Sequence, residues 1–451
     1  MSSRQILDPL FSTGRMAEVF SDRLRIQRML DFEAALARAI VRAGIAPAKV
    51  SEAIQAGCLV EQYSLEVLGS EAPLAGNLAI PLVKALTTFV AKKDPKAAGF
   101  VHWGATSQDV IDTGLVLQLR EALDLFGADL ARLADTLAAM AKKHASVAMA
   151  GRTWLQQAPP VTLGLKIAGW LDAIERHRAR LRELRPRVVV LQFGGAVGTL
   201  AALGEHGPKV ARALAEELHL ELPVIPWHAH RDRLAEVAAA LGLLTGTLGK
   251  IARDISLLMQ TEVGEVFEPG VPGRGGSSTM PHKRNPVGSA SILAAAIRVP
   301  ALVSVMLAAM VEEHERGLGG WQAEWATLPE ICLLAHGALA RAAEIAGGLE
   351  ADTTRMAANL KISHGMILAE SVVFALAERV GRLEALGIVE EACRQAAAKN
   401  RDLAAVLAED SRVSQVLSRE ELAARLDPNR YLGAASEWIE GVLSARKESS
   451  K

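Results

Sequence analysis

Two long stretches of regularly spaced apolar residues constrain the fold of this chain more than any other feature of its sequence. In each stretch the apolar positions alternate between steps of four and three residues, the spacing of a helix that packs along its length in a near-parallel bundle. The first comprises Leu119, Leu123, Phe126, Leu130, Leu133, Leu137 and Met140, and the second comprises Leu234, Val237, Leu241, Leu244, Leu248, Ile251, Ile255 and Leu258. Because a helix rises about 1.5 Å per residue, helices of this length extend beyond an ordinary small domain. We therefore expect a bundle that further copies of the chain complete.

The composition supports an all-α fold. Half of the 451 residues are apolar and only 4% are aromatic. Alanine and leucine dominate, which favours helices packed through small and branched side chains over sheets. Segments before Asp112 are short and interrupted by prolines, and segments after about Ala351 shorten again. We expect three helical domains, at residues 1–112, 113–351 and 352–451, of which the middle one contains the long bundle.

The charge balance limits the partners of the chain. Its 50 Lys and Arg residues nearly equal its 51 Asp and Glu residues, which removes the main electrostatic reason to expect nucleic acid or an anionic membrane as a partner. A small anionic substrate is compatible with this balance, because its binding depends on local charge.

Cysteine usage and hydropathy indicate a cytoplasmic protein. The three cysteines are Cys58, Cys332 and Cys393. They are odd in number and far apart, which favours a reducing compartment over a disulfide framework. The N-terminus lacks the short apolar core of a secretory signal. The most apolar run, residues 291–310, contains Arg298 and Pro300, so we expect a buried helix there and not a membrane span.

The stretch 273–286 lacks a helical pattern and interrupts the long helices. Asn285 suits a helix N-cap, and Pro286 suits the first helical position. Free backbone N–H groups at this helix start, together with the charge of Lys283, predict a binding site for a carboxylate. The same stretch supplies two hydroxyl groups, from Ser277 and Ser278. These hydroxyls are close enough in sequence to act on the bound anion.

Residues 102–109 and 151–160 have the composition of ligand-binding loops that lead into helices. In the first loop, Thr106 and Asp109 have the spacing of a capping box, and hydroxyl and N–H groups at a helix start bind anions well. A helix cap without a ligand is the alternative. The second loop contains hydrogen-bonding side chains at Arg152, Thr153, Trp154 and Gln156. Its alternative is an ordinary surface loop.

Three further features carry expectations of their own. His228 and His230 alternate as two ligands of one metal ion can, but no nearby carboxylate or thiol completes a four-ligand set, so we expect no metal. Residues 314–316 are expected on a helix, where Arg316 either forms a surface ion pair or reaches a substrate carboxylate. Residues 187–193 have the pattern of a short strand.

Residues 276–286, 102–109 and 151–159 together resemble the three motif regions of the fumarase/aspartase superfamily. The first region matches the superfamily's GSSxMPxKxNP pattern at every fixed position, and the resemblance extends over most of the chain. It implies three helical domains, a central bundle of helices from four subunits, and active sites that each combine three chains. The chemistry it implies is addition or elimination across a carbon–carbon bond beside a carboxylate, through an aci-carboxylate dianion and without a cofactor.

The resemblance also implies roles for individual residues. A serine matching Ser277 handles the proton at the carbon, and Lys283 and His102 are further catalytic candidates. The residues expected to bind the substrate are Thr106, Ser107, Arg152, Thr153, Trp154, Gln156, Ser278, Met280, Asn285 and Arg316.

Two departures from the superfamily pattern narrow the reaction. Trp154 stands where the lyases have a histidine, and an indole N–H cannot transfer a proton near neutral pH. Ala290 stands where the adenylosuccinate lyases that resemble this chain have a glutamate. In the lyases the histidine protonates a poor leaving group, so its absence implies a group that needs no proton, such as a carboxylate with a pKa of ~4. If that carboxylate belongs to the substrate itself, the product is a lactone.

Together with these departures, the resemblance implies a lactonising cycloisomerase that acts on a small polycarboxylate, 3-carboxy-cis,cis-muconate, in the breakdown of aromatic compounds. An adenylosuccinate-type amine lyase with a relocated acid is the alternative. A non-catalytic helical scaffold that retains the fold is a third hypothesis.

Overall fold

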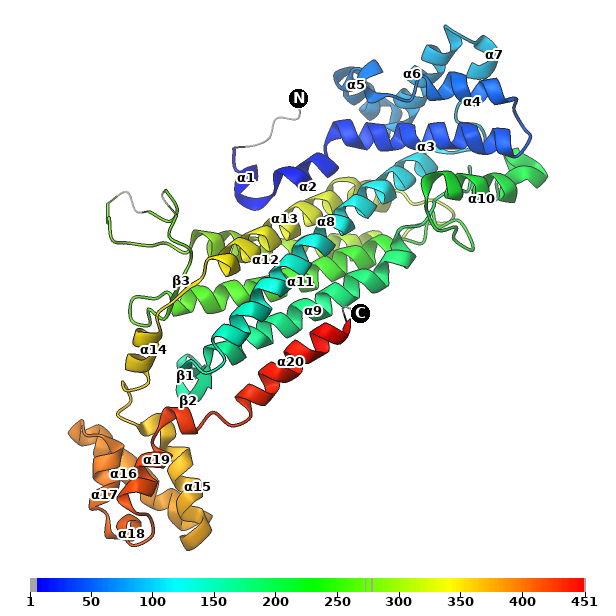
Figure 1. The fold of residues 1–451 in the computed structure, drawn as a ribbon. Helices are drawn as coiled ribbons and strands as arrows, with labels where there is room; N and C mark the ends of the chain where they lie inside the picture. The colour runs from blue at the N-terminus through cyan, green and yellow to red at the C-terminus, as the bar shows by residue number, and fades with distance from the viewer. Residues whose placement is uncertain (1–5, 272, 277–278, 450–451) are drawn as a thin grey trace. The chain divides into compact units, whose positions relative to one another are not determined.

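The computed structural model describes residues 6–271, 273–276 and 279–449. Over these residues the chain is predominantly helical, and its short strands pair in two two-stranded sheets (Figure 1). This confirms the all-α prediction. Contacts divide the chain into two compact units. Unit 1 consists of Met1–Leu130, His177–Gly249 and Ser291–Arg341, and unit 2 consists of Ala131–Arg176, Lys250–Ala290 and Ala342–Lys451. The domain boundaries near residues 112 and 351 stay a prediction.

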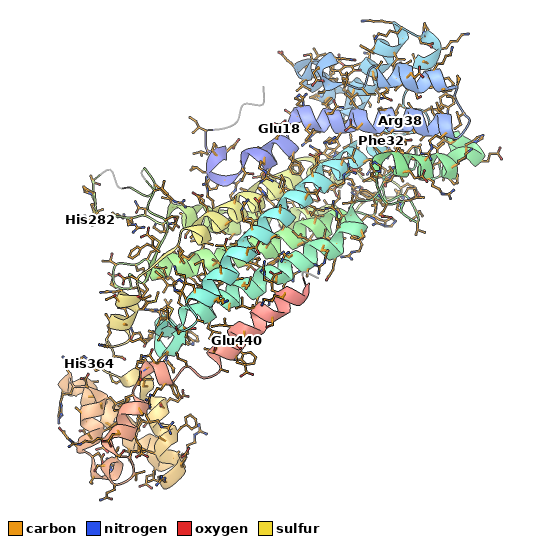
Figure 2. The ribbon with its side chains drawn as sticks, in the orientation of Figure 1. Glu18, Phe32, Arg38, His282, His364 and Glu440 are labelled. Atoms are coloured by element: carbon orange, nitrogen blue, oxygen red, sulfur yellow. The ribbon has the colours of Figure 1, made fainter. Side chains whose placement is uncertain are left out.

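Unit 1 begins with short helices around one long helix, α3 (Asp22–Arg42). Ser21 caps α3, because its side chain accepts a hydrogen bond from the N–H of Leu24. Phe32 and Arg38 lie along this helix (Figure 2), and the Phe32 ring is fully buried against Phe193. The neighbouring helices are α1 (Asp8–Phe11), α2 (Gly14–Val19), α4 (Ala48–Gln55), η1 (Val60–Gln62), α5 (Leu65–Ala75), α6 (Ala79–Ala91) and α7 (Pro95–Ala98).

Long helices follow, and they confirm that both apolar seams lie on long helices. They are α8 (Ser107–Lys143), α9 (Leu163–Val188), α11 (Asp232–Leu258), α12 (Val287–Ala309) and α13 (Gly320–Gly347). The first seam lies on α8 and is buried from Leu119 to Leu137, and every member of the second, on α11, is at most 5% exposed. A Cβ added at Gly249 of α11 would lie 2.7 Å from the Cβ of Ala296 on α12, so these helices approach closely through small residues. Two shorter elements, η2 (Ala201–His206) and α10 (Gly207–Leu218), precede α11.

Unit 2 contains the two sheets and the C-terminal helices. Strands β1 (Ala148–Thr153) and β2 (Gln156–Thr162) form an antiparallel hairpin, and β3 (Val266–Phe267) pairs with β4 (Glu350–Ala351). The C-terminal helices bury a separate apolar cluster that includes Leu376, Ile388 and Leu407. These elements are α14 (Thr353–Asn359), η3 (Met366–Leu368), α15 (Ala369–Val380), α16 (Arg382–Lys399), α17 (Leu403–Glu409), α18 (Ser411–Ser414), α19 (Arg419–Arg425), η4 (Pro428–Arg430) and α20 (Ala435–Ser449).

Two local predictions are wrong. Residues 187–193 do not form a strand, because α9 continues through Pro186 to Val188 and only Val190 makes an isolated bridge, to Glu221. The apolar residues of this segment are buried although they form no strand. A short apolar run in a sequence does not distinguish a buried strand from the buried end of a helix. Residues 314–316 do not lie on a helix, because they fall in the loop between α12 and α13.

Helix α12 is also less buried than its sequence suggests. It and α11 are both long and apolar enough to cross a bilayer by length and composition. In α11, 61% of the most apolar window is buried inside the chain, whereas in α12 only 28% is buried. The prediction of a buried helix over residues 291–310 is therefore wrong for the single chain, and α12 presents an extensive apolar surface.

Candidate active site

The turn before α8 brings Thr106 and Arg316 together in unit 1. Arg316 Nη2 donates to Thr106 Oγ1 at 2.9 Å and to the carbonyl oxygen of Ala196 at 2.8 Å. The Arg316 Nε is buried and finds no hydrogen-bond partner among the described residues. Because both acceptors are neutral, the guanidinium keeps its charge available for an anion. Ser107, the first residue of α8, is half-buried beside Thr106.

Asp109 fixes the backbone around this turn. Its Oδ2 accepts the N–H groups of Thr106 at 3.0 Å and Gly195 at 2.9 Å, and its Oδ1 accepts the N–H of Gly194 at 3.0 Å and contacts His228 Nε2 at 2.7 Å. The Asp109 side chain is fully buried. One half of the predicted capping box is confirmed, because the Asp109 carboxylate accepts the N–H of Thr106.

His228 and His230 do not pair around a common centre. His228 is buried against Asp109, whereas His230 is exposed. In the described part of the chain, no group of three or more His, Cys, Asp and Glu side chains is arranged to hold a metal ion. His228 instead supports the Thr106 turn through Asp109.

His102 is held by Glu33, a residue of α3 that the sequence did not single out. His102 Nδ1 lies 2.6 Å from Glu33 Oε1, and the His102 backbone N–H donates to Glu33 Oε2 at 3.1 Å. The Glu33 side chain is 1% exposed and the His102 side chain 18%. Burial alone lowers the pKa of the His102 imidazole, but the Glu33 carboxylate, with a smaller contribution from Asp109, raises that pKa above its ordinary value.

Arg231 lies at the centre of a buried ionic cluster in unit 1, which the sequence also did not reveal. Its guanidinium is bonded to Asp112, with Nη1–Oδ2 at 2.6 Å, and to Glu324, with Nε–Oε1 at 3.1 Å. Glu312 Oε1 lies 3.9 Å from Arg231 Nε. Trp321 Nε1 donates to Asp112 Oδ1 at 3.0 Å. Because these side chains are at most 4% exposed, the cluster is a structural core and not an open site.

In unit 2, Arg152 is bonded to a carboxylate of the protein itself. Its Nη1 and Nη2 donate to Glu265 Oε2 and Oε1 at 2.9 and 2.8 Å, and Asn359 Nδ2 donates to Glu265 Oε1 at 2.8 Å. The Glu265 side chain is fully buried, whereas that of Arg152 is 23% exposed. Arg152 therefore has its most favourable donors committed inside the protein, and any substrate contact would use its exposed edge.

The tip of the β1–β2 hairpin displays Trp154 and Leu155. Thr153 pairs directly with Gln156, so the two residues between them form a two-residue turn, with φ of 52° at Trp154 and 65° at Leu155. Positive φ at both positions defines a type I′ turn, which normally takes Asn and Gly. Trp154 is 97% and Leu155 82% exposed, and Thr153 and Gln156 are exposed as well.

The stretch 273–286 differs from its prediction at the helix start. Helix α12 begins at Val287, and Asn285 does not cap it: its backbone N–H donates to Gly275 O at 2.8 Å, and its side chain approaches Gly276 O. Lys283 is exposed. Met280 is 43% exposed, and His282 projects outward from the same stretch (Figure 2). Ser277 and Ser278 lie outside the described residues.

The predicted carboxylate site at the start of α12 is filled by a side chain of the chain itself. Glu268 Oε1 accepts the N–H of Ser289 and the Ser289 hydroxyl, both at 2.7 Å, and Glu268 Oε2 accepts the N–H of Gly288 at 3.0 Å. A helix start attracts an anion, as predicted, but the anion is internal. The prediction that these N–H groups are free for a ligand is wrong.

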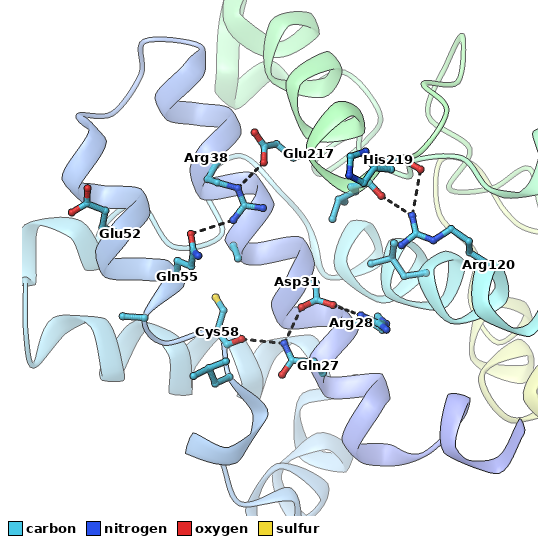
Figure 3. Close-up of a pocket in the computed structure, with 15 residues that line it drawn as sticks. Gln27, Arg28, Asp31, Arg38, Glu52, Gln55, Cys58, Arg120, Glu217 and His219 are labelled. Carbon is cyan, nitrogen blue, oxygen red and sulfur yellow. Dashed lines mark hydrogen bonds and ion pairs between the residues drawn. The ribbon is translucent and has the colours of Figure 1, made fainter. Parts of the chain in front are cut away.

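A hollow of about 770 Å³ lies elsewhere in unit 1, among α3, α4, α8 and α10 (Figure 3). Its arginine side chains already have partners: Arg38 Nε donates to Glu217 at 2.6 Å, and Arg120 donates to the carbonyl oxygen of Leu218 at 2.8 Å. It contains none of the residues predicted to form the active site. The hollow is therefore not the candidate site.

Comparisons with known proteins identify the family of the chain. A family model described as Lyase matches residues 11–301, and one described as Adenylosuccinate lyase C-terminus matches residues 365–442. The chain belongs to the fumarase/aspartase superfamily of lyases. It is 59% identical to a 3-carboxy-cis,cis-muconate cycloisomerase of Pseudomonas aeruginosa over 98% of this chain and 96% of that protein. It is 57% identical to the Pseudomonas putida enzyme of the same name, over 93% of this chain and 100% of that protein.

A solved structure gives the same result. The crystal structure of a 3-carboxy-cis,cis-muconate lactonizing enzyme from Pseudomonas putida superposes with a TM-score of 0.95 at 55% identity, covering 99% of this chain and all of that chain. The superfamily motif regions fall in both units. His102, Thr106, Ser107 and Arg316 belong to unit 1, and Arg152, Thr153, Trp154, Gln156, Met280, Lys283 and Asn285 belong to unit 2.

Sequence reasoning missed the carboxylates that support these residues. Glu33 interrupts the apolar face of α3, and a lone acidic residue at a buried helical position was the available signal. Glu265 and Glu268 flank the short strand β3 and gave no such signal, because their partners are distant in sequence.

Proposed function

We propose that this chain converts 3-carboxy-cis,cis-muconate to 4-carboxymuconolactone. A carboxylate oxygen of the substrate forms a bond to an alkene carbon, and a proton is added at the carbon alpha to a neighbouring carboxylate. No group leaves, and no electrons are transferred to another molecule, so the reaction balances without a cofactor. The near full-length similarity to enzymes of this name carries the proposal and favours it over an adenylosuccinate lyase.

The substrate carries three carboxylates, and the chain offers several groups to hold them. Arg316, with its charge unneutralised beside Thr106, is the first of these groups in unit 1. Lys283, Asn285 and the exposed edge of Arg152 are the corresponding groups in unit 2. Positioning of the attacking carboxylate near the alkene contributes by lowering the entropic cost of ring closure, and the cationic groups stabilise the charge that develops on the neighbouring carboxylate.

We assign the proton transfer at the alpha carbon to Ser277, with Lys283 stabilising the serine anion. Trp154 supports a reaction without acid assistance to a leaving group, because its indole cannot supply a proton. Ser107, Thr153, Gln156, Ser278 and Met280 complete the proposed substrate-binding set.

Turnover is tested by following ultraviolet absorbance during incubation with 3-carboxy-cis,cis-muconate and, separately, with adenylosuccinate. We expect loss of the conjugated-diene absorbance with the first compound and no change with the second. Ser277→Ala should lower kcat by at least about 100-fold, while the exposed Ser444→Ala control should retain full activity. Full turnover by Ser277→Ala would contradict the assigned proton transfer, and turnover of adenylosuccinate alone would overturn the proposed reaction.

We also infer a homotetramer in which α12 lies at the centre. Its exposed apolar side chains, Ile297 at 76%, Leu307 at 51% and Val305 at 39%, support burial against other copies. Light scattering should give four times the mass of the chain. Ile297→Lys should dissociate the assembly, whereas Leu383→Lys, at an 86% exposed position on α16, should not. A monomeric wild-type protein would contradict the inference.

We place this enzyme in the cytoplasm, where the breakdown of aromatic compounds would supply its substrate. Its three cysteines are free thiols, which suits a reducing compartment. Cell fractionation with an antibody against the chain tests this placement, and recovery in a membrane or periplasmic fraction would contradict it.

A further inference from the structure

The contact between Glu33 and His102 is unusual for a helix face that is otherwise apolar. Glu33 lies on α3 among Leu30, Phe32 and Leu36, each at most 1% exposed. A buried ion pair seldom stabilises a fold more than apolar side chains of similar volume would. Stability alone therefore does not account for a carboxylate at this position.

Glu33 holds His102 at two points. One carboxylate oxygen lies 2.6 Å from the ring Nδ1, and the other accepts the backbone N–H of the same residue at 3.1 Å. His102 has a φ of 59°, in the left-handed region that side chains with a Cβ adopt at a cost. The two-point contact offsets this cost and fixes the backbone and the ring together.

This contact determines which nitrogen of the His102 ring carries a proton. Because a carboxylate only accepts hydrogen bonds, Nδ1 must carry a proton toward Glu33. The second nitrogen, Nε2, makes no hydrogen bond to any described residue, and the side chain is 18% exposed. When the ring is protonated, Nε2 carries an N–H that is not bonded to Glu33. His102 is the first residue of the 102–109 loop, which also contains Thr106.

We propose that Glu33 is a positioning residue that holds the His102 imidazolium as a directed N–H donor for a carboxylate of the substrate. The inference rests on the proposed function, because it needs a polycarboxylate substrate at the 102–109 loop. Two acidic groups face His102 from different helices: Glu33 from α3 and Asp109 from α8. Both favour the protonated ring, and Glu33 contributes more because it is in direct contact.

The test combines two measurements on wild-type protein, Glu33→Gln and Glu33→Asp. The first is an NMR titration of the His102 imidazole, assigned by comparison with His102→Gln. Glu33→Gln keeps a hydrogen-bonding group of the same size without the charge, so the pKa of His102 should fall. Glu33→Asp keeps the charge and should preserve most of the elevation. Glu18→Gln, an exposed change on α2 (Figure 2), should leave the pKa unchanged.

The second measurement is the pH profile of kcat/KM for 3-carboxy-cis,cis-muconate. If the protonated ring binds the substrate, activity falls as pH rises through the pKa of His102. In Glu33→Gln this alkaline limb should move to lower pH by the shift found by NMR, with about a tenfold loss of kcat/KM per pKa unit at pH values above both limbs. Glu33→Asp should restore most of the wild-type profile, which a purely structural role would not require.

Two results would overturn the inference. One is an unchanged pKa of His102 in Glu33→Gln, and the other is a lowered pKa with an unmoved kcat/KM profile. Failure of the proposed function is distinguishable, because it would appear as absence of turnover by the wild-type protein, while the NMR titration would still report on Glu33. Thermal unfolding of each variant identifies any that fails to fold, and Glu33→Asp then serves as the second variant.

Discussion

Arg231 in unit 1 and Arg152 in unit 2 are both arginines bonded to buried carboxylates, but their charge balance differs. Arg231 is surrounded by three carboxyl groups, those of Asp112, Glu312 and Glu324. Arg152 faces one, Glu265, which also accepts a hydrogen bond from the neutral amide of Asn359. The first cluster therefore has more carboxyl groups than cations in a buried interior, whereas the second has one of each.

The excess in the Arg231 cluster is relieved by a proton. Burial raises the pKa of both Glu312 and Glu324. Glu324 is bonded directly to the guanidinium, whereas both Glu312 oxygens are buried without a hydrogen-bond partner among the described side chains. The geometry therefore favours Glu312 as the site of the proton, although burial also raises the pKa of Glu324, to about 7, despite its bond to the guanidinium. The number of surrounding carboxyl groups distinguishes the two arginines. Arg231, which has more carboxyl groups around it than it can neutralise, is the centre of a structural cluster.

The largest expected effect comes from removing Arg231. Arg231→Met leaves Asp112 and Glu324 buried without their counter-ion, so the free energy of unfolding should fall by about 5 kcal/mol, the upper end for a broken buried ion pair. Urea denaturation measures this loss. The exposed Arg212→Met control should change stability by less than about 0.5 kcal/mol. A loss no larger than the control's would show that the cluster is not a structural centre.

Arg152→Met should have a smaller effect on stability. Glu265 loses its counter-ion but keeps the hydrogen bond from Asn359, so we expect a loss of about 3 kcal/mol, the lower end of the same range. Urea denaturation and steady-state kinetics on the folded variant should be compared. If Arg152 also binds a substrate carboxylate, KM rises as well, and an unchanged KM would assign the residue to structure alone.

Asn359→Leu tests the neutral member of the balanced cluster. The change removes one hydrogen bond to the Glu265 carboxylate and one to the carbonyl oxygen of Val263, so stability should fall by about 1–2 kcal/mol. The ion pair with Arg152 remains. A loss as large as that of Arg152→Met would mean that the hydrogen bond from the amide stabilises the buried Glu265 carboxylate as much as the guanidinium does.

The smallest expected effect is a change in pH dependence. A carboxyl group with a raised pKa in the folded protein stabilises the fold fully below its ordinary pKa of about 4.3, and this contribution is lost as pH rises through the folded-state pKa. Glu312→Gln should therefore reduce the loss of stability that occurs as pH rises from the ordinary pKa through the folded-state pKa. Urea midpoints measured at several pH values would show this reduction. The exposed Glu315→Gln should leave the slope unchanged. If Glu312→Gln leaves it unchanged too, the proton is not on Glu312.

Sequence patterns predicted the fold far better than they predicted the environment of the site. The seams on α8 and α11 are local repeats, so burial and helix type followed directly from spacing. The Thr106–Asp109 cap is local too, and one of its hydrogen bonds is present. For Arg316 the sequence allowed either a surface ion pair or a contact with a substrate carboxylate. Its hydrogen bond to Thr106 does not support a surface ion pair, and the residue lies in a loop and not on a helix.

The errors share a physical cause. Whether the helix start before Gly288 is free for a ligand depends on Glu268, and whether Arg152 is available depends on Glu265. Neither pairing follows from spacing along the chain, because a carboxylate and its donor meet only after the fold forms. For the same reason the exposure of α12 could not be read from an apolar composition that suits a core and a subunit interface equally.

The turn at Trp154 and Leu155 has a consequence for engineering. A sequence chosen for folding alone would place Asn and Gly there, because both positions require φ above zero. That replacement would relieve the unfavourable backbone conformation and remove two large apolar side chains from solvent, so a redesign guided by stability would favour it. It would also remove Trp154, the residue from which we infer a reaction without acid assistance, so a thermostabilised variant should keep these two residues and seek stability at other positions.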